Sequence, residues 1–501
     1  MERKAGILMP VSSLPGDYGI GSLGKEAYRF VDFLAQTGCG IWQVLPLLPT
    51  SYGDSPYSAC SSNALNPYFI DLDLLAKEGL LEEEEYASLH WGRDPHRVDY
   101  AKLYELRFEV LKRAFSRFDR TAPAWLFFLR EGKYRDYAVF MSLKMRFHGA
   151  PFTEWGDYAE YDEAVVSAYC AENQDEIEFW QFTQYEFLLQ WRKLKEYAGG
   201  RGVEIMGDMP IYLARDSVEM WKYRRSLFLL DEAGAPSVQA GVPPDAFSDT
   251  GQLWGNPVYD WEKHKREGYD WWHKRISDSL DLYDWVRIDH FIGFVRYYCI
   301  PEGLTDARLG EWRKGPGAEL FKGLEDRHIV AEDLGIVTDE VRAAIAETGY
   351  PGMRILQHAF DGNPQNEHKP SNCPQNAVIY TGTHDNETLF TRISQMHGKE
   401  RTRMIRDLKS ECAKTGVRAS VRTNRKICDT ILRLLFASRA DMAIAPLQDV
   451  MRMGREGRIN APSTVSPENW SYRFTAEDFT PALARRLARL VGLRKKEKIM
   501  K

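Results

Sequence analysis

Residues 5–45 read AGILMPVSSLPGDYGIGSLGKEAYRFVDFLAQTGCGIWQVL, and this stretch decides the fold class. It begins with the mostly apolar run Ala5–Val11 and ends with a second run, Ile41–Leu45. Between the two runs, apolar residues recur at helical spacing from Ala27 to Leu34, and the helix closes at Gly38. The stretch therefore predicts one strand–helix–strand unit of a parallel α/β protein.

Further strand candidates repeat this rhythm along the chain. Each is a short apolar run, which suits a strand covered on both faces. A long helical pattern over Phe179–Ala198 precedes the first of them. These strand candidates are Val203–Met206, Ile329–Ala331, Met353–Leu356, Val378–Tyr380 and Met442–Ala445. A chain of 501 residues is too long for one small domain, but it suits a single large barrel with insertions.

Two segments depart from the strand–helix rhythm. Residues 74–178 are rich in charged and aromatic residues, and apolar residues recur at helical spacing between Leu103 and Phe118, which predicts a mostly helical insertion. The stretch Leu230–Trp261 contains several Gly and Pro residues and is predicted to be an irregular loop, and long loops inside compact domains are usually functional or disordered. We therefore expect one catalytic barrel over residues 1–501, with a helical insertion at about 74–178 and cleft-covering insertions at about 226–285 and 390–465.

Composition excludes several classes of function. The 66 basic and 72 acidic residues are well mixed and give a net charge of −6, so no basic stripe indicates nucleic acid. Aromatic residues make up 13% of the chain, which suits stacking on sugar rings, although large barrels also bury many aromatics. The composition is compatible with a neutral, hydroxyl-rich ligand.

The seven cysteines are scattered and form no C-x-x-C pair, so we expect neither a disulfide framework nor a zinc site. We also expect no metal and no other cofactor. No apolar stretch is long enough for a signal peptide or a membrane span, and we therefore expect a soluble, cytoplasmic protein that does not bind membranes.

Three acidic motifs follow apolar strand candidates. They are Val286-Arg287-Ile288-Asp289-His290, Ala331-Glu332-Asp333-Leu334-Gly335 and Thr383-His384-Asp385-Asn386. Because all strands of a parallel barrel end on the same face, carboxylates at these positions converge. Converging carboxylates are what cleavage of a glycosidic bond needs: one protonates the leaving oxygen, and another attacks or stabilises the oxocarbenium-like carbon.

Each motif alone has an ordinary structural interpretation. An acidic residue after a strand is often only the N-cap of the next helix. Arg287 and Asp289 are compatible with a structural ion pair, and His384 with a core histidine. The occurrence of all three motifs in this order favours the catalytic interpretation.

The same motifs show a resemblance to a known family. The chain resembles the amylomaltases, the 4-α-glucanotransferases related to the α-amylase clan, over almost its whole length. The resemblance implies a (β/α)8 TIM barrel with inserted subdomains on its C-terminal face, one of them largely helical. Besides the three acidic motifs, it is carried by Ser12-Ser13-Leu14-Pro15-Gly16, Ser55-Pro56-Tyr57, Asn66-Pro67, Gly207-Asp208-Met209-Pro210, Leu253-Trp254-Gly255-Asn256-Pro257 and Ser471-Tyr472-Arg473.

The resemblance implies a role for each acidic motif. Asp289 is expected to be the nucleophile, Glu332 the acid/base, and Asp385 a ligand of the distorted donor sugar. Arg287 precedes Asp289 by two residues and points to the same face, so it would keep the nucleophile ionised. Glu332 must be protonated at neutral pH, which burial and neighbouring carboxylates favour. A retaining mechanism predicts roughly 5–5.5 Å between the two catalytic carboxyl groups.

The resemblance also implies substrate-binding residues. His384 and Tyr57 are expected to contact the donor sugar, and Asp208 and Asn460 match positions at the donor cleft, although both are equally compatible with bracing loops. Asp245, Gln252 and Trp254 match a loop that covers the cleft. Ala246 replaces an aromatic residue that many relatives carry, which puts the acceptor preference in doubt.

The expected activity is transfer of α-1,4-glucan segments to the 4-hydroxyl of glucose or of another glucan. The partners would be maltooligosaccharides and glucans derived from starch or glycogen, with glucose as acceptor. The chain is expected to be the compact form of the family. A hydrolase would use the same three carboxylates with water as acceptor. A non-catalytic glucan-binding barrel would have lost one of them, and none is lost.

Overall fold

Eight parallel strands close into a barrel in the computed structural model, which describes residues 3–51, 53–244, 248–325 and 327–494. Around the barrel the strands follow the order β1-β12-β11-β10-β9-β6-β3-β2. Their bounds are β1 Lys4–Leu8, β2 Ile41–Gln43, β3 Glu204–Met209, β6 Trp285–Ile288, β9 Ile329–Ala331, β10 Gly352–Ile355, β11 Ala377–Tyr380 and β12 Met442–Pro446. This arrangement confirms the predicted (β/α)8 barrel.

The apolar runs form barrel strands because both of their faces are buried. In β12, Met442 and Ile444 belong to a cluster of side chains drawn from alternate positions of neighbouring strands, which fills the barrel. Ala443 and Ala445 point the other way and belong to the larger cluster beneath the helices. Because neither face of such a strand contacts solvent, polar residues do not alternate with apolar ones along it. The strands therefore appear in the sequence as continuous apolar runs.

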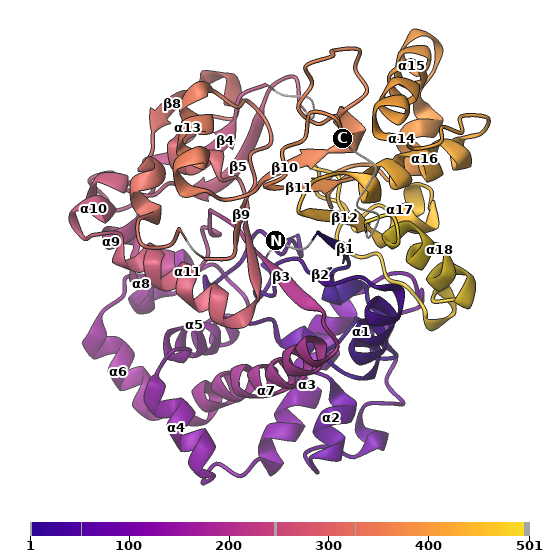
Figure 1. Cartoon of the computed structure of the whole chain (residues 1–501). Helices are drawn as coiled ribbons and strands as arrows, with labels where there is room; N and C mark the ends of the chain where they lie inside the picture. The colour runs from indigo at the N-terminus through magenta and orange to yellow at the C-terminus, as the bar shows by residue number, and fades with distance from the viewer. Residues whose placement is uncertain (1–2, 52, 245–247, 326, 495–501) are drawn as a thin grey trace.

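Helices cover the outside of the barrel (Figure 1). Helix α1 (Lys25–Thr37) ends at Gly38, whose φ of 78° lies in the left-handed region that glycine adopts readily. The helices after β3 are α8 Val218–Lys222, α9 Arg224–Leu227, α10 Trp261–Arg266, α11 Asp270–Leu282, α12 Ile292–Val295, α13 Asp339–Thr348, α14 Leu389–Gln395, α15 Gly398–Thr415, α16 Asn424–Ala437, α17 Leu447–Met451 and α18 Pro481–Val491.

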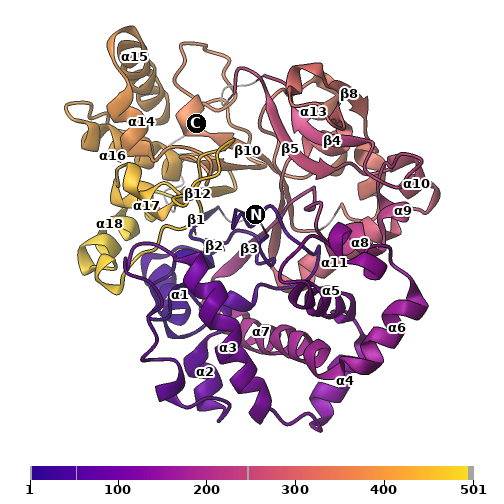
Figure 2. The same cartoon turned by 180° about the vertical axis from the view of Figure 1, so that it is seen from behind.

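The connection between β2 and β3 carries a group of helices. Both views show them gathered on one side of the barrel (Figures 1 and 2). The predicted helix over Phe179–Ala198 lies within the longest of them, α7. The group consists of α2 Leu72–Lys77, α3 Tyr100–Arg117, α4 Pro123–Glu131, α5 Arg135–Arg146, α6 Glu163–Glu172 and α7 Gln174–Gly200.

The prediction of an irregular loop over Leu230–Trp261 is wrong. Strands β4 (Val238–Val242) and β5 (Gln252–Pro257) lie within it and pair with each other in antiparallel fashion. They form a four-stranded sheet, in the order β5-β4-β7-β8, with β7 (Arg296–Pro301) and β8 (Glu311–Lys314). Because β4 pairs with β7 about 60 residues further along the chain, no local pattern of residues announces this sheet.

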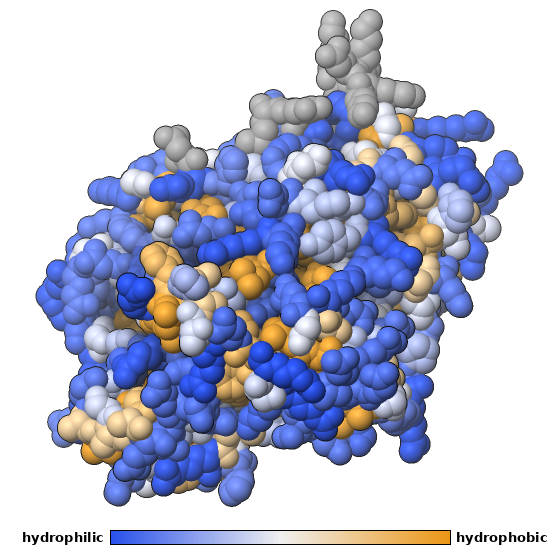
Figure 3. Space-filling model, turned by 90° about the horizontal axis from the view of Figure 1, so that it is seen from below, coloured by the Kyte–Doolittle hydropathy of each residue, from blue (hydrophilic) through white to orange (hydrophobic). Residues whose placement is uncertain are grey.

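Apolar side chains are largely withdrawn from the surface. The face in Figure 3 is mostly hydrophilic, and hydrophobic residues show mainly in hollows across its middle. All seven cysteines are free, and six of them are buried. Among the residues that the structure describes, no helix combines the length and the apolar character needed to cross a bilayer.

Candidate active site

A cleft of about 720 Å³ lies at the carboxyl ends of the barrel strands. Most residues singled out from the sequence line it together, and Asp208 contacts two of them, Arg287 and Tyr57. Asp245, and with it Ala246, lies outside the described residues. The predicted residues that line the cleft are Tyr57, Gln252, Trp254, Arg287, Asp289, Glu332, His384, Asp385 and Asn460.

Arg287 joins two carboxylates at the floor of the cleft. Its Nη1 atom lies 2.8 Å from both carboxylate oxygens of Asp208, and its Nη2 atom lies 2.9 Å from Oδ1 of Asp289. The side chains of Arg287 and Asp289 point the same way because they are two residues apart at the end of β6. Burial disfavours the charged guanidinium, but the two carboxylates outweigh it and hold the pKa of Arg287 well above its usual range.

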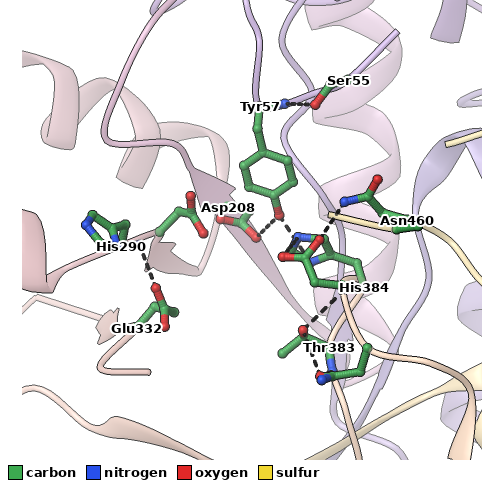
Figure 4. Close-up of polar contacts among 12 residues, drawn as sticks. Ser55, Tyr57, Asp208, His290, Glu332, Thr383, His384 and Asn460 are labelled. Atoms are coloured by element: carbon green, nitrogen blue, oxygen red, sulfur yellow. Dashed lines mark hydrogen bonds and ion pairs between the residues drawn. The ribbon is translucent and has the colours of Figure 1, made fainter. Parts of the chain in front are cut away.

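Asp208 contacts residues of the cleft without lining it. Its side chain is fully buried and accepts a 2.8 Å hydrogen bond from the hydroxyl of Tyr57. The ring of Tyr57 stacks on His384 with centroids 4.8 Å apart, and its hydroxyl lies 3.3 Å from Nδ1 of that histidine (Figure 4). Asp208 is therefore connected to the cleft through its contacts with Arg287 and Tyr57.

His384 and Asp385 lie in contact after β11. Nε2 of His384 lies 3.3 Å from Oδ2 of Asp385, and the Asn460 amide donates a 2.7 Å hydrogen bond to Oδ1. Burial raises the pKa of Asp385, but His384 and the Asn460 amide outweigh it and bring this pKa to about 2. Burial lowers the pKa of His384, whereas the Asp385 carboxylate raises it above the ordinary value overall.

Glu332 follows β9 on the other side of the site, opposite His384 and Asn460 (Figure 4). Its two carboxyl oxygens each accept a 2.8 Å hydrogen bond from a backbone N–H, Oε2 from His290 and Oε1 from Leu334. Burial raises the pKa of Glu332 to about 8; the charge of Arg287 opposes this shift, and the carboxylate of Asp289 adds to it. Glu332 therefore carries a proton at neutral pH.

The residue after Asp289 links the two carboxyl groups through the main chain. His290 has a φ of 50°, in the left-handed region that few side chains favour. This turn directs its N–H at Glu332, while the N–H of Glu332 itself donates to the carbonyl of Ile288. Burial lowers the pKa of the His290 imidazole to about 4, so the ring is neutral.

The second sheet supplies one wall of the cleft. Trp254, on β5, meets the ring of His290 edge-on with centroids 4.9 Å apart, and its indole N–H donates to Gln252 at 3.2 Å. Lining residues that the sequence did not single out include Trp312, His358, His368 and Trp470. In the sequence, two of these residues lie next to a predicted feature: His358 follows β10 closely, and Trp470 precedes the motif at Ser471.

Within the described part of the chain, no group of three or more His, Cys, Asp or Glu side chains is placed to hold a metal ion. The site instead offers carboxyl groups in different environments, an arginine and hydrogen-bonding side chains around an open cleft. A protonated carboxyl group and further carboxylates around an open cleft at the carboxyl ends of a (β/α)8 barrel fit the class of enzymes that break and form glycosidic bonds.

Comparison with known proteins identifies the family within this class. The model of the 4-alpha-glucanotransferases, glycoside hydrolase family 77, matches residues 9–478. The chain belongs to this family. The 4-alpha-glucanotransferase of Streptococcus pneumoniae serotype 4 is 43% identical, with 96% of this chain and 95% of that protein covered. The 4-alpha-glucanotransferase of Thermus thermophilus is 40% identical, with 97% and 98% covered.

Solved structures agree with this assignment. The amylomaltase of Streptococcus agalactiae in complex with acarbose superimposes with a TM-score of 0.92 at 38% identity, with 99% of each chain covered. The amylomaltase of Corynebacterium glutamicum superimposes with a TM-score of 0.77 at 18% identity, over 98% of this chain and 75% of that one, and therefore shares the fold.

Proposed function

We propose that this 4-α-glucanotransferase moves a segment of an α-1,4-glucan to the 4-hydroxyl of glucose or of another α-1,4-glucan by a retaining double displacement. The observation that carries the proposal is the convergence of Asp289, Glu332 and Asp385 on one cleft, with Glu332 protonated near neutral pH. The names of the relatives and the acarbose complex of the S. agalactiae enzyme support α-glucans as substrates.

In the first displacement, the carboxylate of Asp289 attacks the anomeric carbon of the donor, and Glu332 gives its proton to the leaving oxygen. The leaving glucan departs as an alcohol, and a covalent glycosyl ester with Asp289 remains. Arg287 orients Asp289 through the 2.9 Å contact. Asp385, held by His384 and Asn460, would bind hydroxyls of the donor ring.

In the second displacement, Glu332 removes the proton of the acceptor hydroxyl, which attacks the anomeric carbon and releases Asp289. The change of role has a physical cause. The negative charge of Asp289 is one of the causes that raise the pKa of Glu332, and the ester removes this charge. The pKa of Glu332 therefore falls in the intermediate, where a base is needed.

Cleft-covering segments favour a sugar acceptor over water. Gln252, Trp254 and Asn256 line the cleft from the segment at about 226–285, and Asn460, Pro462 and Ser463 line it from the segment at about 390–465. We propose that both segments cover bound glucan and limit access of water to the ester. The division of the chain into one barrel and three insertions, and its cytoplasmic location, stay predictions.

Incubation with maltotriose tests the proposed function. The expected result is a ladder of longer maltooligosaccharides together with released glucose, with little growth in total reducing ends. Steady growth in reducing ends with only shorter products would make the protein a hydrolase. Absence of any product would favour a glucan-binding barrel.

A further inference from the structure

A second cavity adjoins the cleft along the connection between β10 and β11. It is an open groove of about 480 Å³, lined by Arg342, Asn363, Gln365, Asn366, Glu367 and His368. His368 lines both the groove and the cleft, so the two spaces meet at this side chain. We call this cavity the β10–β11 groove.

The lining of the β10–β11 groove indicates the chemistry of its ligand. All six residues are polar, and the two charged ones neutralise each other through a 3.0 Å ion pair between Arg342 and Glu367. A lining without apolar side chains does not suit a lipid or an apolar peptide, and a neutral lining does not suit a phosphate group. Amide, guanidinium and imidazole groups suit a neutral ligand rich in hydroxyl groups.

The groove is also preorganised. The Oδ1 atoms of Asn363 and Asn366 accept hydrogen bonds from backbone N–H groups two residues further on, at 3.0 and 2.8 Å. The Asn372 amide donates to the carbonyls of Pro364 and Asn366 at 2.9 and 2.8 Å. A connection held by its own side chains loses little conformational entropy when a ligand binds.

His368 offers a hydrogen-bond donor where groove and cleft meet. Its Nδ1 atom accepts the backbone N–H of Ile355 at 3.1 Å. Burial, together with the nearby His358 and Arg354, lowers the pKa of His368 to about 4, so the ring is neutral. The proton therefore resides on Nε2, which has no hydrogen-bond acceptor among the residues that the structure describes.

We propose that the β10–β11 groove is a remote subsite for α-1,4-glucan chains that extend from the catalytic cleft past His368. The proposal rests on the proposed function and adds a determinant of chain-length preference. A short glucan occupies the cleft alone, whereas a longer chain also reaches the groove, where Asn363 and Gln365 donate hydrogen bonds to its hydroxyl groups.

Two substitutions test the groove without touching the cleft. Gln365→Ala removes an exposed side chain that makes no hydrogen bond or ion pair within the described residues. Asn363→Asp keeps the Oδ1 acceptor for the Gln365 N–H and removes the amide donor. Each variant should lower kcat/KM for maltoheptaose about two- to tenfold, the effect of one neutral hydrogen bond, and leave kcat/KM for maltotriose unchanged. Gln36→Ala, an exposed position on α1, is the matched control.

His368→Asn provides a further variant, because the Asn side chain can retain an acceptor near the Ile355 N–H and lacks the outer donor. It should lower kcat/KM for maltoheptaose more than for maltotriose. Equal losses with both substrates for all three variants, or no loss for any of them, would overturn the proposal.

Binding separates this proposal from the proposed function. In Glu332→Gln, which leaves the groove intact, calorimetric titration with maltoheptaose should give a Kd that rises two- to tenfold when Gln365→Ala is added. This shift would support the groove even if wild-type protein transferred no glucan, and an unchanged Kd would count against it.

Discussion

Nη1 of Arg287 lies 2.8 Å from both carboxylate oxygens of Asp208, and both side chains are buried. A buried ion pair adds little net stability over an apolar pair, but removal of one partner leaves an uncompensated charge. Arg287 also contacts Asp289, so loss of Asp208 should affect both the fold and the position of Asp289.

Asp208→Ala should therefore lower the free energy of unfolding by about 3–5 kcal/mol, together with a loss of transferase activity. Urea unfolding measures the first effect. Asp306→Ala is a suitable control, because it breaks an exposed pair with Arg308 and should change the free energy of unfolding much less. Similar costs for the two substitutions would contradict the structural role of Asp208.

Glu332→Gln should lower the rate of transfer from maltotriose about 10²- to 10⁴-fold, because no proton reaches the leaving oxygen. A maltosyl fluoride donor releases fluoride, which needs no proton, so the first-turnover burst of fluoride should be largely restored in this variant, while later turnovers stay slow because the base is missing. Asp289→Asn lacks the nucleophile and should not be restored. Failure of the fluoride donor to rescue Glu332→Gln would remove Glu332 from the role of acid.

The pH dependence of kcat/KM should show an alkaline limb with an apparent pKa of about 8. The limb arises because the raised pKa of Glu332 keeps the acid protonated below this pH and ionised above it. Rates measured with maltotriose between pH 6 and pH 10 test this. For the maltosyl fluoride donor, whose leaving group needs no acid, the limb should be absent from the first displacement.

The same pKa predicts a pH dependence of stability. The pKa of Glu332 is raised from 4.5 to about 8 on folding, so the folded state binds the proton more tightly than the unfolded state does. This contribution to stability is fully present below about pH 4.5 and is lost as the pH rises to about 8. Urea unfolding of wild type and Glu332→Gln across this range should show a smaller decline in the variant, and parallel curves would contradict it.

The left-handed turn at His290 can be tested with two substitutions that both remove the imidazole. Asn adopts a positive φ readily, and the β-branched side chain of Val disfavours it. His290→Val should lose the N–H bond to Glu332, which stabilises the ionised carboxylate, so the alkaline limb should move to higher pH. His290→Asn should keep the limb in place, and an equal shift in both variants would assign the effect to the ring instead.

Asn460→Ala should lower kcat/KM for maltotriose about 10- to 100-fold, because a hydrogen bond to a charged group is lost at Asp385. Initial rates at several maltotriose concentrations provide the measurement. A value within twofold of wild type would show that Asn460 only braces its loop.

The sequence predicted the barrel and most of the site for a physical reason. Strands buried on both faces are continuous apolar runs, and residues at their carboxyl ends must meet, so Asp289, Glu332 and Asp385 could be placed together. The roles given to them came from the family resemblance.

Other features depend on contacts that no local pattern contains. The sheet that carries Trp254 forms by pairing of β4 with the distant β7. One of the two backbone N–H groups that hold Glu332 belongs to the left-handed turn at His290, and His368 reaches the cleft only through the folded connection after β10. The sequence offered no signal for these three features.

The main-chain link between His290 and Glu332 has a consequence for divergence within the family. The backbone on either side of Asp289 is tied to Glu332 by hydrogen bonds that involve main-chain groups of His290 and Ile288, so the proposed nucleophile and acid/base share one main-chain frame. Substitutions among the side chains that surround the sugar can change which glucans are accepted while the anomeric configuration of the product is preserved. The fold thus separates the chemistry from the choice of substrate, so that substrate preference can change during evolution while the reaction is retained.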